Sequence, residues 1–279
     1  MSAEMASLRL DHADCLDWLP TLEPGSVQLM VADPPYFRVQ LETAWDNVWA
    51  DEGAYLEWSE RWLRAAARVL RPNGLLFLFG QPGKREQAFL RLMPLACTIL
   101  PFHDLIIWDR VVGANERRDS FTPCYEMILV LRGGEGPPYF NKDAVREPYD
   151  SATIATYLRD KRYQNREARQ AHLSKGKYAT NLWRIPSLKG ASKEKVGHPS
   201  QKPLALVERI VLSSSRPGDL VVDPFLGSGS TAVMAVQLGR RFAGCDNHAP
   251  YVEMARVRTE CVQRQPSLSL PQRPQEREG

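Results

Sequence analysis

Two short runs of residues carry side chains suited to chemistry. In the first, Asp33-Pro34-Pro35-Tyr36 follows an apolar run from Val27 to Ala32. Neither proline has a backbone N–H, and each restricts the residue before it to extended geometry, which predicts a rigid elbow at the end of a buried strand. The elbow would present the Asp33 carboxylate, unpaired backbone carbonyls and the face of Tyr36. Hydrogen-bond acceptors beside an aromatic face suit a planar ring that carries an exocyclic amino group.

The second run is a glycine-rich loop, Asp223-Pro224-Phe225-Leu226-Gly227-Ser228-Gly229-Ser230-Thr231, after a short apolar strand. Its glycines and Asp246, 19 residues after Gly227, fit a dinucleotide-binding fingerprint in which the acid binds a ribose. An acid before the glycines suits a cationic amino group better than a pyrophosphate, while Ser230 and Thr231 either cap a helix or bind a carboxylate. Binders for an amino group, a carboxylate and a ribose together describe S-adenosylmethionine, an amino acid joined to a nucleoside.

The rest of the chain must supply the elements that position these runs. Apolar runs predict strands at residues 8–10, 27–32, 75–79, 105–108, 127–131, 220–222 and 241–245. Helical spacing predicts helices at about 55–69, 86–93 (ended by Pro94), 203–215, 231–238 and 250–263. This alternation indicates an α/β protein with a doubly wound, mostly parallel sheet, whose ligands bind at the carboxyl ends of the strands. Four acids that end apolar strands should face one crevice there: Asp14, Asp33, Asp223 and Asp246.

Charge is distributed unevenly along the 279 residues. The net charge is +3, but residues 157–203 hold twelve basic and three acidic residues, so the remainder sums to −6. This segment is interleaved with Tyr157, Tyr163, Tyr178 and Trp183, as a nucleic-acid contact would require. Five scattered cysteines without CxxC spacing argue for reduced thiols in a cytoplasmic protein and against a zinc site. No signal-peptide pattern and no apolar run long enough for a membrane span occur.

These features predict one sheet domain with an insertion. Residues 1–132 form its first part, with the proline elbow, and residues 198–263 form its cofactor-binding part. The basic segment 133–197, where regular apolar periodicity fades, is the insertion. Residues 264–279, rich in proline, glutamine, serine and arginine, form a disordered tail.

In both motifs and in their order, the chain resembles a β-class amino DNA methyltransferase, in which the catalytic Asp-Pro-Pro-Tyr precedes the cofactor loop. Further matches are Asp14-Cys15-Leu16, Trp45-Asp46, Arg68-Val69-Leu70-x-Pro72-x-Gly74 and His198-Pro199-x-Gln201-Lys202-Pro203. The resemblance implies a circularly permuted Rossmann-like fold with seven strands, one of them antiparallel near an edge. It also implies that the cofactor is S-adenosylmethionine and that the substrate is double-stranded DNA.

The resemblance assigns roles to individual residues. Asp33 and the Pro34 carbonyl would accept hydrogen bonds from the two amino N–H groups of a flipped base, with Tyr36 stacked on it and with Pro35 and Phe37 in contact with it. The cofactor would be bound by Asp14, Lys202 (at its methionine end), Asp223, Phe225, Gly227, Gly229, Ser230, Thr231 and Asp246. In the insertion, Arg162, Arg166 and Arg169 would contact DNA. We expect no bound metal and no nucleophilic cysteine.

Several functions compete on this fold. An aspartate at the first elbow position favours adenine N6 over cytosine N4, although the amine chemistry is identical. An RNA methyltransferase and a catalytically silent DNA-binding module are weaker alternatives, and a nicotinamide oxidoreductase leaves the proline elbow unexplained. The recognition sequence, a homodimer and a cognate restriction nuclease are left open by the sequence.

Overall fold

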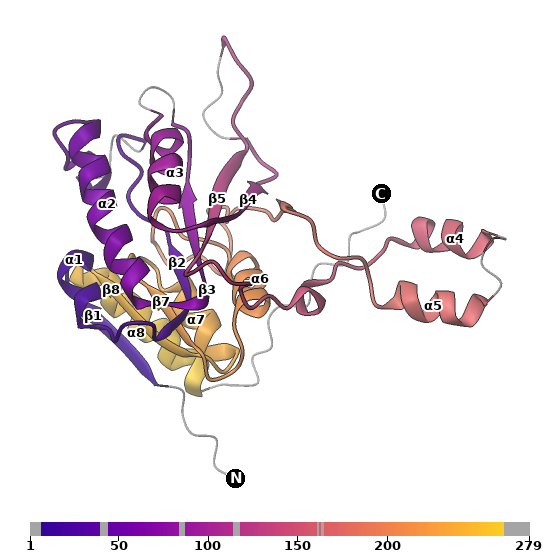
Figure 1. Ribbon diagram of the computed structural model, residues 1–279. Coiled ribbons are helices and arrows are strands. Elements are labelled where there is room, and N and C mark those ends of the chain that lie inside the picture. The colour runs from indigo at the N-terminus through magenta and orange to yellow at the C-terminus, as the bar shows by residue number, and fades with distance from the viewer. Residues whose placement is uncertain are drawn as a thin grey trace.

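A computed structural model describes residues 7–39, 44–83, 87–113, 118–160, 162 and 165–264, and its centre is an eight-stranded sheet (Figure 1). The strands are β1 (Leu8–His12), β2 (Val27–Ala32), β3 (Leu70–Gly80), β4 (Phe102–Asp109), β5 (Tyr125–Arg132), β6 (Leu182–Arg184), β7 (Leu220–Asp223) and β8 (Arg241–Asp246). Their order is β1-β8-β7-β2-β3-β5-β4-β6, and among these described strands β5 runs antiparallel to the others. The predicted fold class is therefore confirmed.

The expected number of seven strands is wrong by one. The additional strand, β6, comes from the insertion and pairs in parallel with β4. Two indole side chains hold this segment in place. The Trp108 indole N–H donates to the Ile185 carbonyl at 2.7 Å, and the Trp183 indole N–H donates to the Thr180 carbonyl at 2.8 Å. Three residues are too few to produce a recognisable alternation, so this strand has no clear sequence signal.

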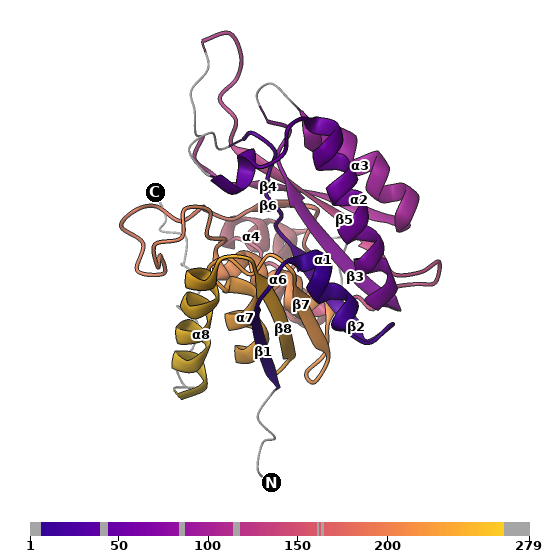
Figure 2. The ribbon, with the colours of Figure 1, turned by 90° about the vertical axis from the view of Figure 1, so that its left-hand side faces the viewer.

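Helices cover both faces of the sheet (Figures 1 and 2). One face carries α1 (Cys15–Trp18), α2 (Glu52–Val69) and α3 (Ala88–Ile99), and the other carries α6 (Leu204–Ser214), α7 (Ser230–Gln237) and α8 (Ala249–Arg264). Successive side chains of β2 enter opposite cores, as a central strand buried on both faces requires. None of the helices in the described ranges is long and apolar enough to cross a membrane.

The predicted end of a helix at Pro94 is wrong, because α3 continues through that residue to Ile99. Pro94 lies on the less buried side of the helix, where water can bond the carbonyl that its ring leaves without a partner. The buried side chains of Leu92 and Ala96 hold the helix on the sheet on either side of the proline.

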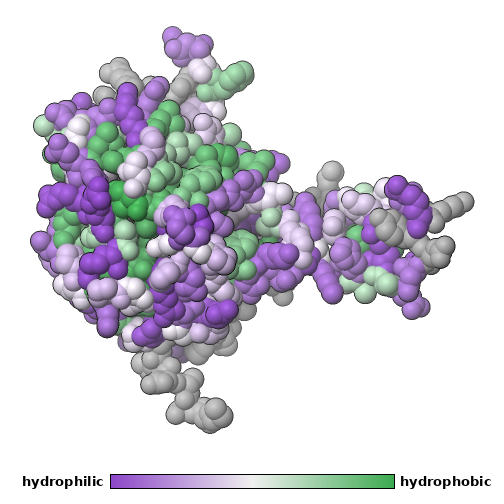
Figure 3. Space-filling view, in the orientation of Figure 1, coloured by the Kyte–Doolittle hydropathy of each residue, from purple (hydrophilic) through white to green (hydrophobic). Residues whose placement is uncertain are grey.

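The insertion contains a helical hairpin that projects from the body (Figure 1). Its helices are α4 (Ser151–Arg159) and α5 (Arg166–Ser174), and its surface is mainly hydrophilic (Figure 3). Two backbone hydrogen bonds between Glu147 and Lys177 close its base, and Arg209 of α6 lies 3.0 Å from the Glu147 carboxylate. Apolar periodicity is weak here because α4 has no buried residue and α5 has only one, Leu173. The tail predicted from residue 264 onward lies outside the described residues beyond Arg264.

Candidate active site

A cavity of about 590 Å³ opens at the carboxyl ends of the parallel strands. All four acids that end apolar strands line it: Asp14, Asp33, Asp223 and Asp246. They meet because β7 pairs with β2 and β8 pairs with both β7 and β1, which brings the two sequence motifs to one edge of the sheet. The predicted crevice is therefore present.

The elbow after β2 is fixed by hydrogen bonds from outside it. The buried Asp46 carboxylate accepts the Tyr36 backbone N–H at 2.8 Å, and the Tyr55 hydroxyl donates to the Pro35 carbonyl at 3.0 Å. Pro34, Pro35 and Tyr36 line the cavity. Phe37, expected to contact the base, does not line it: this residue is 2% exposed and stacks on Tyr55 at a centroid distance of 5.5 Å.

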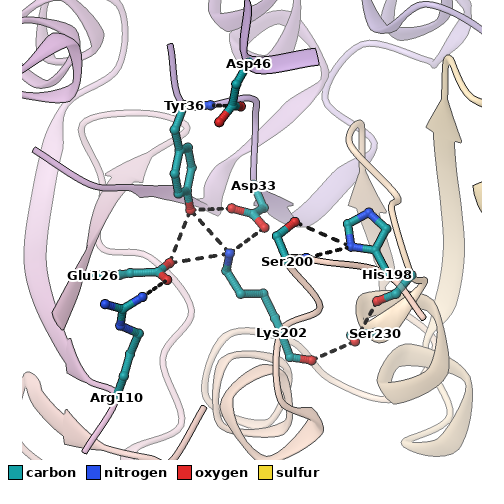
Figure 4. A network of polar contacts seen from close by, with 10 residues as sticks. Asp33, Tyr36, Asp46, Arg110, Glu126, His198, Ser200, Lys202 and Ser230 are labelled. Atoms are coloured by element: carbon teal, nitrogen blue, oxygen red, sulfur yellow. Dashed lines mark hydrogen bonds and ion pairs between the residues drawn. The ribbon is translucent and has the colours of Figure 1, made fainter. Parts of the chain in front are cut away.

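Behind the elbow lies a network of buried charges (Figure 4). The Tyr36 hydroxyl donates to Asp33 Oδ1, and Glu126 Oε2 lies 3.3 Å from the same hydroxyl oxygen. Lys202 Nζ lies 2.6 Å from Asp33 Oδ2 and 3.4 Å from Glu126 Oε2. Burial, together with the two carboxylates, raises the pKa of Tyr36 well above its usual value, so the hydroxyl remains a donor at every physiological pH.

Glu126 and Arg110, whose guanidinium lies 3.4 Å from Glu126 Oε1, were not predicted. Glu126 stands at the start of β5, just before the apolar run at 127–131. In an antiparallel strand the residues at the start, and not those at the end, lie at the catalytic edge. A carboxylate directly before an apolar strand is thus a signal, but only when the direction of that strand is known.

Lys202 joins the two halves of the cavity. Its backbone carbonyl accepts the Ser230 hydroxyl at 2.8 Å, whereas its amine lies among Asp33, Tyr36 and Glu126. The side chain expected at the methionine end of the cofactor therefore contacts the elbow acid. The contact of this residue with the glycine-rich loop is made by its backbone.

Asp14 and Asp246 shape the far side of the cavity through backbone hydrogen bonds. Asp246 accepts the Gly227 N–H at 2.8 Å and the His248 N–H at 2.9 Å, while Asp14 caps α1 by accepting the Leu16 N–H at 2.8 Å. Each carboxylate retains acceptor capacity toward the cavity, since an ionised carboxylate offers about four lone-pair sites.

Asp223 lines the cavity and is almost fully buried, 4% exposed. It accepts the Phe225 N–H at 3.0 Å and a bond from the Thr231 hydroxyl. Burial, with lesser repulsion from Asp33 and Asp246, outweighs these hydrogen bonds and raises its pKa to about 7. A cationic partner would stabilise the ionised form of such a buried carboxyl group strongly.

The hydroxyls of the glycine-rich loop do not cap a helix. The N-cap of α7 is Gly229, which has no side-chain capping bond, and Ser230 and Thr231 instead bond the Lys202 carbonyl and Asp223. Both residues line the cavity. Phe225 also lines it, edge-on to Trp62 at 5.2 Å, so an apolar wall stands beside the acids.

Gly229 does not line the cavity; it packs the loop against α8. Its φ is +76°, and a Cβ there would lie 2.5 Å from the Cβ of Ala255.

We expect Gly229→Ala to lower the free energy of unfolding by about 2–3 kcal/mol, since it adds backbone strain to overpacking. Urea denaturation of both proteins measures this, and a midpoint unchanged from wild type would show that α8 can shift away.

The three arginines expected to contact DNA lie on the projecting hairpin, outside the cavity. Arg162 forms an ion pair with Asp160 at 2.6 Å, and the Arg169 guanidinium lies 4.9 Å above the Tyr157 ring. Arg166 is exposed in the first turn of α5. Among the aromatic residues counted with this segment, Trp183 is buried in β6 and Tyr163 lies outside the described residues.

Within the part of the chain that the structure describes, thiols and metal ligands add no second site. All five cysteines are free, and Cys15 and Cys245 are buried. Within the described ranges, no group of three or more His, Cys, Asp or Glu side chains could hold a metal ion.

A family model described as DNA methylase, for N6 and N4 methyltransferases, matches residues 27–257 and so spans both motifs. The chain belongs to this family of amino DNA methyltransferases. It is 32% identical over 252 residues to the type II methyltransferase M1.MboII of Moraxella bovis, covering 88% of this chain and 94% of that protein. It is 31% identical over 267 residues to M2.DpnII of Streptococcus pneumoniae, covering 90% and 89%.

Solved structures agree on the fold. The cytosine-N4-specific PvuII DNA methyltransferase superposes with a TM-score of 0.67 at 16% identity, covering 94% of this chain and 92% of that one. A putative DNA modification methylase of Thermus thermophilus, complexed with S-adenosyl-L-methionine, gives 0.61 at 24% identity, covering 94% and 96%.

As an amino DNA methyltransferase, the protein uses S-adenosylmethionine as its methyl donor and DNA as its substrate. The cavity fits such a cofactor on its own evidence. A buried acid with a raised pKa (Asp223) suits an ammonium group, a second acid (Asp246) stands at the neighbouring strand end, and aromatic side chains wall the space beside them.

Proposed function

We propose that this methylase transfers a methyl group to N6 of adenine in double-stranded DNA, after flipping the base into the cavity. The observation that carries the proposal is that the Asp33 carboxylate and the Tyr36 ring line the same cavity as the glycine-rich loop. An acceptor for an exocyclic amine and a site for an amino-acid nucleoside thus adjoin each other. The aspartate at the first elbow position favours adenine over cytosine.

The elbow residues would act by holding and orienting the amine. Flipping costs a few kcal/mol, part of which stacking on Tyr36 would offset. Asp33 and the Pro34 carbonyl would accept hydrogen bonds from the two amino N–H groups, which draws the nitrogen lone pair out of conjugation with the ring. The cofactor supplies an electrophilic methyl group on a sulfonium. Transfer is then a direct displacement aided by orientation and charge placement, without a covalent enzyme intermediate.

The acids of the far side would hold the cofactor. Asp223 would accept from its ammonium group and Asp246 from its ribose hydroxyls, with Asp14 nearby and with Phe225 against an apolar surface. Ser230 and Thr231 would support these contacts. Gly227 has no side chain and would allow the cofactor to approach the backbone closely, while its N–H donates to Asp246.

The base assignment has a direct test. Unmethylated DNA is incubated with the enzyme and S-adenosylmethionine, digested to nucleosides and examined by mass spectrometry. We expect N6-methyladenine; N4-methylcytosine in its place would overturn the assignment of the base, and no methylated base on any DNA would favour a silent DNA-binding module. Activity on RNA alone would identify the substrate as RNA.

We further propose a sequence-specific role in the cytoplasm, as part of restriction–modification. The support is the type II designation of the relatives, M1.MboII and M2.DpnII among them. A cognate nuclease of the same recognition sequence and a homodimer are both compatible with this role. Protection of DNA from cleavage after treatment with the enzyme, tested against a panel of nucleases, would identify the recognition sequence.

The α4–α5 hairpin is the proposed DNA-reading element. Replacing Arg162, Arg166 and Arg169 with alanine should weaken DNA binding and flatten its dependence on salt, by about one unit of slope for each phosphate that is no longer bound. Binding isotherms at several salt concentrations measure this. A control variant replaces three exposed arginines elsewhere, Arg64, Arg256 and Arg264. Wild-type affinity and slope in the hairpin variant would place the recognition surface elsewhere.

A further inference from the structure

We propose that Lys202 and Glu126 are positioning residues of the methyl-transfer step, and that the Lys202 amine serves Asp33 and not the cofactor. The pair would hold the Asp33 carboxylate at a fixed rotation beside a neutralising cation, ready to accept a hydrogen bond from the amine of the flipped base. This inference rests on the proposed amine-methylating function, but it holds equally for adenine and cytosine.

The first support is the burial of the charges. The side chains of Lys202 and Glu126 are 10% and 7% exposed, and Asp33 is 21% exposed. A buried ammonium must be paired to be tolerated, and here it lies between two carboxylates. With Arg110 on the other oxygen of Glu126, two cations balance two anions (Figure 4).

The second support is the orientation of the Asp33 carboxylate. Its Oδ1 accepts the Tyr36 hydroxyl and its Oδ2 accepts the Lys202 amine at 2.6 Å, so both oxygens are held and the group cannot rotate freely. Each carboxylate oxygen has a further lone pair. An incoming amino group can therefore bind Asp33 without displacing Lys202 or Tyr36.

The third support is the need for a cation at this place. Asp33 and Glu126 both contact the Tyr36 hydroxyl, and the buried Asp223 adds a further negative group nearby. Carboxylates held this close in a buried site repel one another, and a cation placed between them offsets that repulsion. His198 supplies no charge, because burial lowers its pKa to about 4. That leaves Lys202 as the cation in direct contact with Asp33 among the described residues.

The geometry also argues against a cofactor contact by this amine. All three of its donors have acceptors within 3.4 Å: Asp33, Glu126 and the Tyr36 hydroxyl. Burial acts to lower the pKa of Lys202, but the two adjacent carboxylates outweigh it and raise that pKa, so the amine stays charged. An unscreened cation would repel the sulfonium of the cofactor, and the two carboxylates cancel that charge.

The test separates the rate of transfer from cofactor binding. Lys202→Met should lower kcat by about 100-fold, with the Kd of S-adenosylmethionine within about threefold of wild type. Lys202→Arg should recover part of kcat, and Arg64→Met, an exposed cation of α2, serves as the control for loss of charge.

A second variant tests the same inference if Lys202→Met fails to fold. Glu126→Gln keeps the shape of the side chain and should lower kcat about tenfold with unchanged cofactor affinity. Wild-type kcat in Glu126→Gln, or a Lys202→Met enzyme with weakened cofactor binding and normal saturated rate, would overturn the inference. A wild-type enzyme that methylates no nucleic acid would instead refute the proposed function.

Discussion

Replacing Asp33 with alanine is expected to lower the rate of methyl transfer by about 10³-fold or more, at saturating DNA and cofactor. The substitution removes the acceptor that aims the amine, and orientation and charge placement are the main sources of catalysis in a direct displacement. The protein should still fold, because Lys202 keeps Glu126 as a partner at 3.4 Å. Cofactor affinity should change less than about threefold, since Asp33 is assigned to the amine.

Single-turnover methylation with radiolabelled cofactor measures the rate, and calorimetry measures the affinity. Asp17→Ala provides a matched control, because Asp17 is exposed on α1 and does not line the cavity. Turnover near that of wild type in Asp33→Ala would remove the elbow from the catalytic site.

Asp223→Asn should make the ligand-free protein more stable at pH 8 while weakening cofactor binding by about tenfold or more. The folded-state pKa of Asp223 is about 7 against an ordinary value of 3.8. Its contribution to stability is therefore fully present below about pH 4 and is lost as the pH rises through 7. A difference of about three pKa units corresponds to at most about 4 kcal/mol, which the neutral amide would recover.

The cofactor reverses this effect in the wild-type protein. A bound ammonium group favours the ionised carboxylate, so affinity should fall as the pH drops below about 7. Thermal denaturation at pH 5 and pH 8, with and without S-adenosylmethionine, tests both halves of the prediction. Equal melting temperatures for Asp223→Asn and wild type at pH 8 would show that the ionised Asp223 carboxylate does not destabilise the folded protein.

The catalytic edge could be predicted from sequence because its residues follow apolar strands. Asp33 comes directly after β2 and Asp223 ends β7, and a doubly wound sheet brings such ends together. The same reasoning failed for Glu126, whose strand is antiparallel and begins at that edge. It could not place the Lys202 amine either, because a motif gives the position of a backbone and not the direction of a long side chain.

The insertion was harder to predict for a different reason. Its helices bury almost nothing, and α4 and α5 are defined by capping residues, Asp150 and Asn165, that also occur in ordinary turns. The positive charge of the insertion was evident from its composition. Its shape depends on contacts such as that of Arg169 with Tyr157, which leave no periodic pattern in the sequence. Gly229 shows a third limit, since a glycine that allows close packing and one that approaches a ligand look alike in sequence.

The order of the strands also governs when this protein can assemble on the ribosome. Leu8 of β1 pairs with Phe242 of β8, and β2 completes its ladder only when β7 has been made. Until then the nascent chain carries an apolar strand with an unpaired edge, which is prone to pair with other chains. We expect translation stalled before β7 to yield an aggregation-prone, inactive chain, so that methylation begins only after the last strands have left the ribosome.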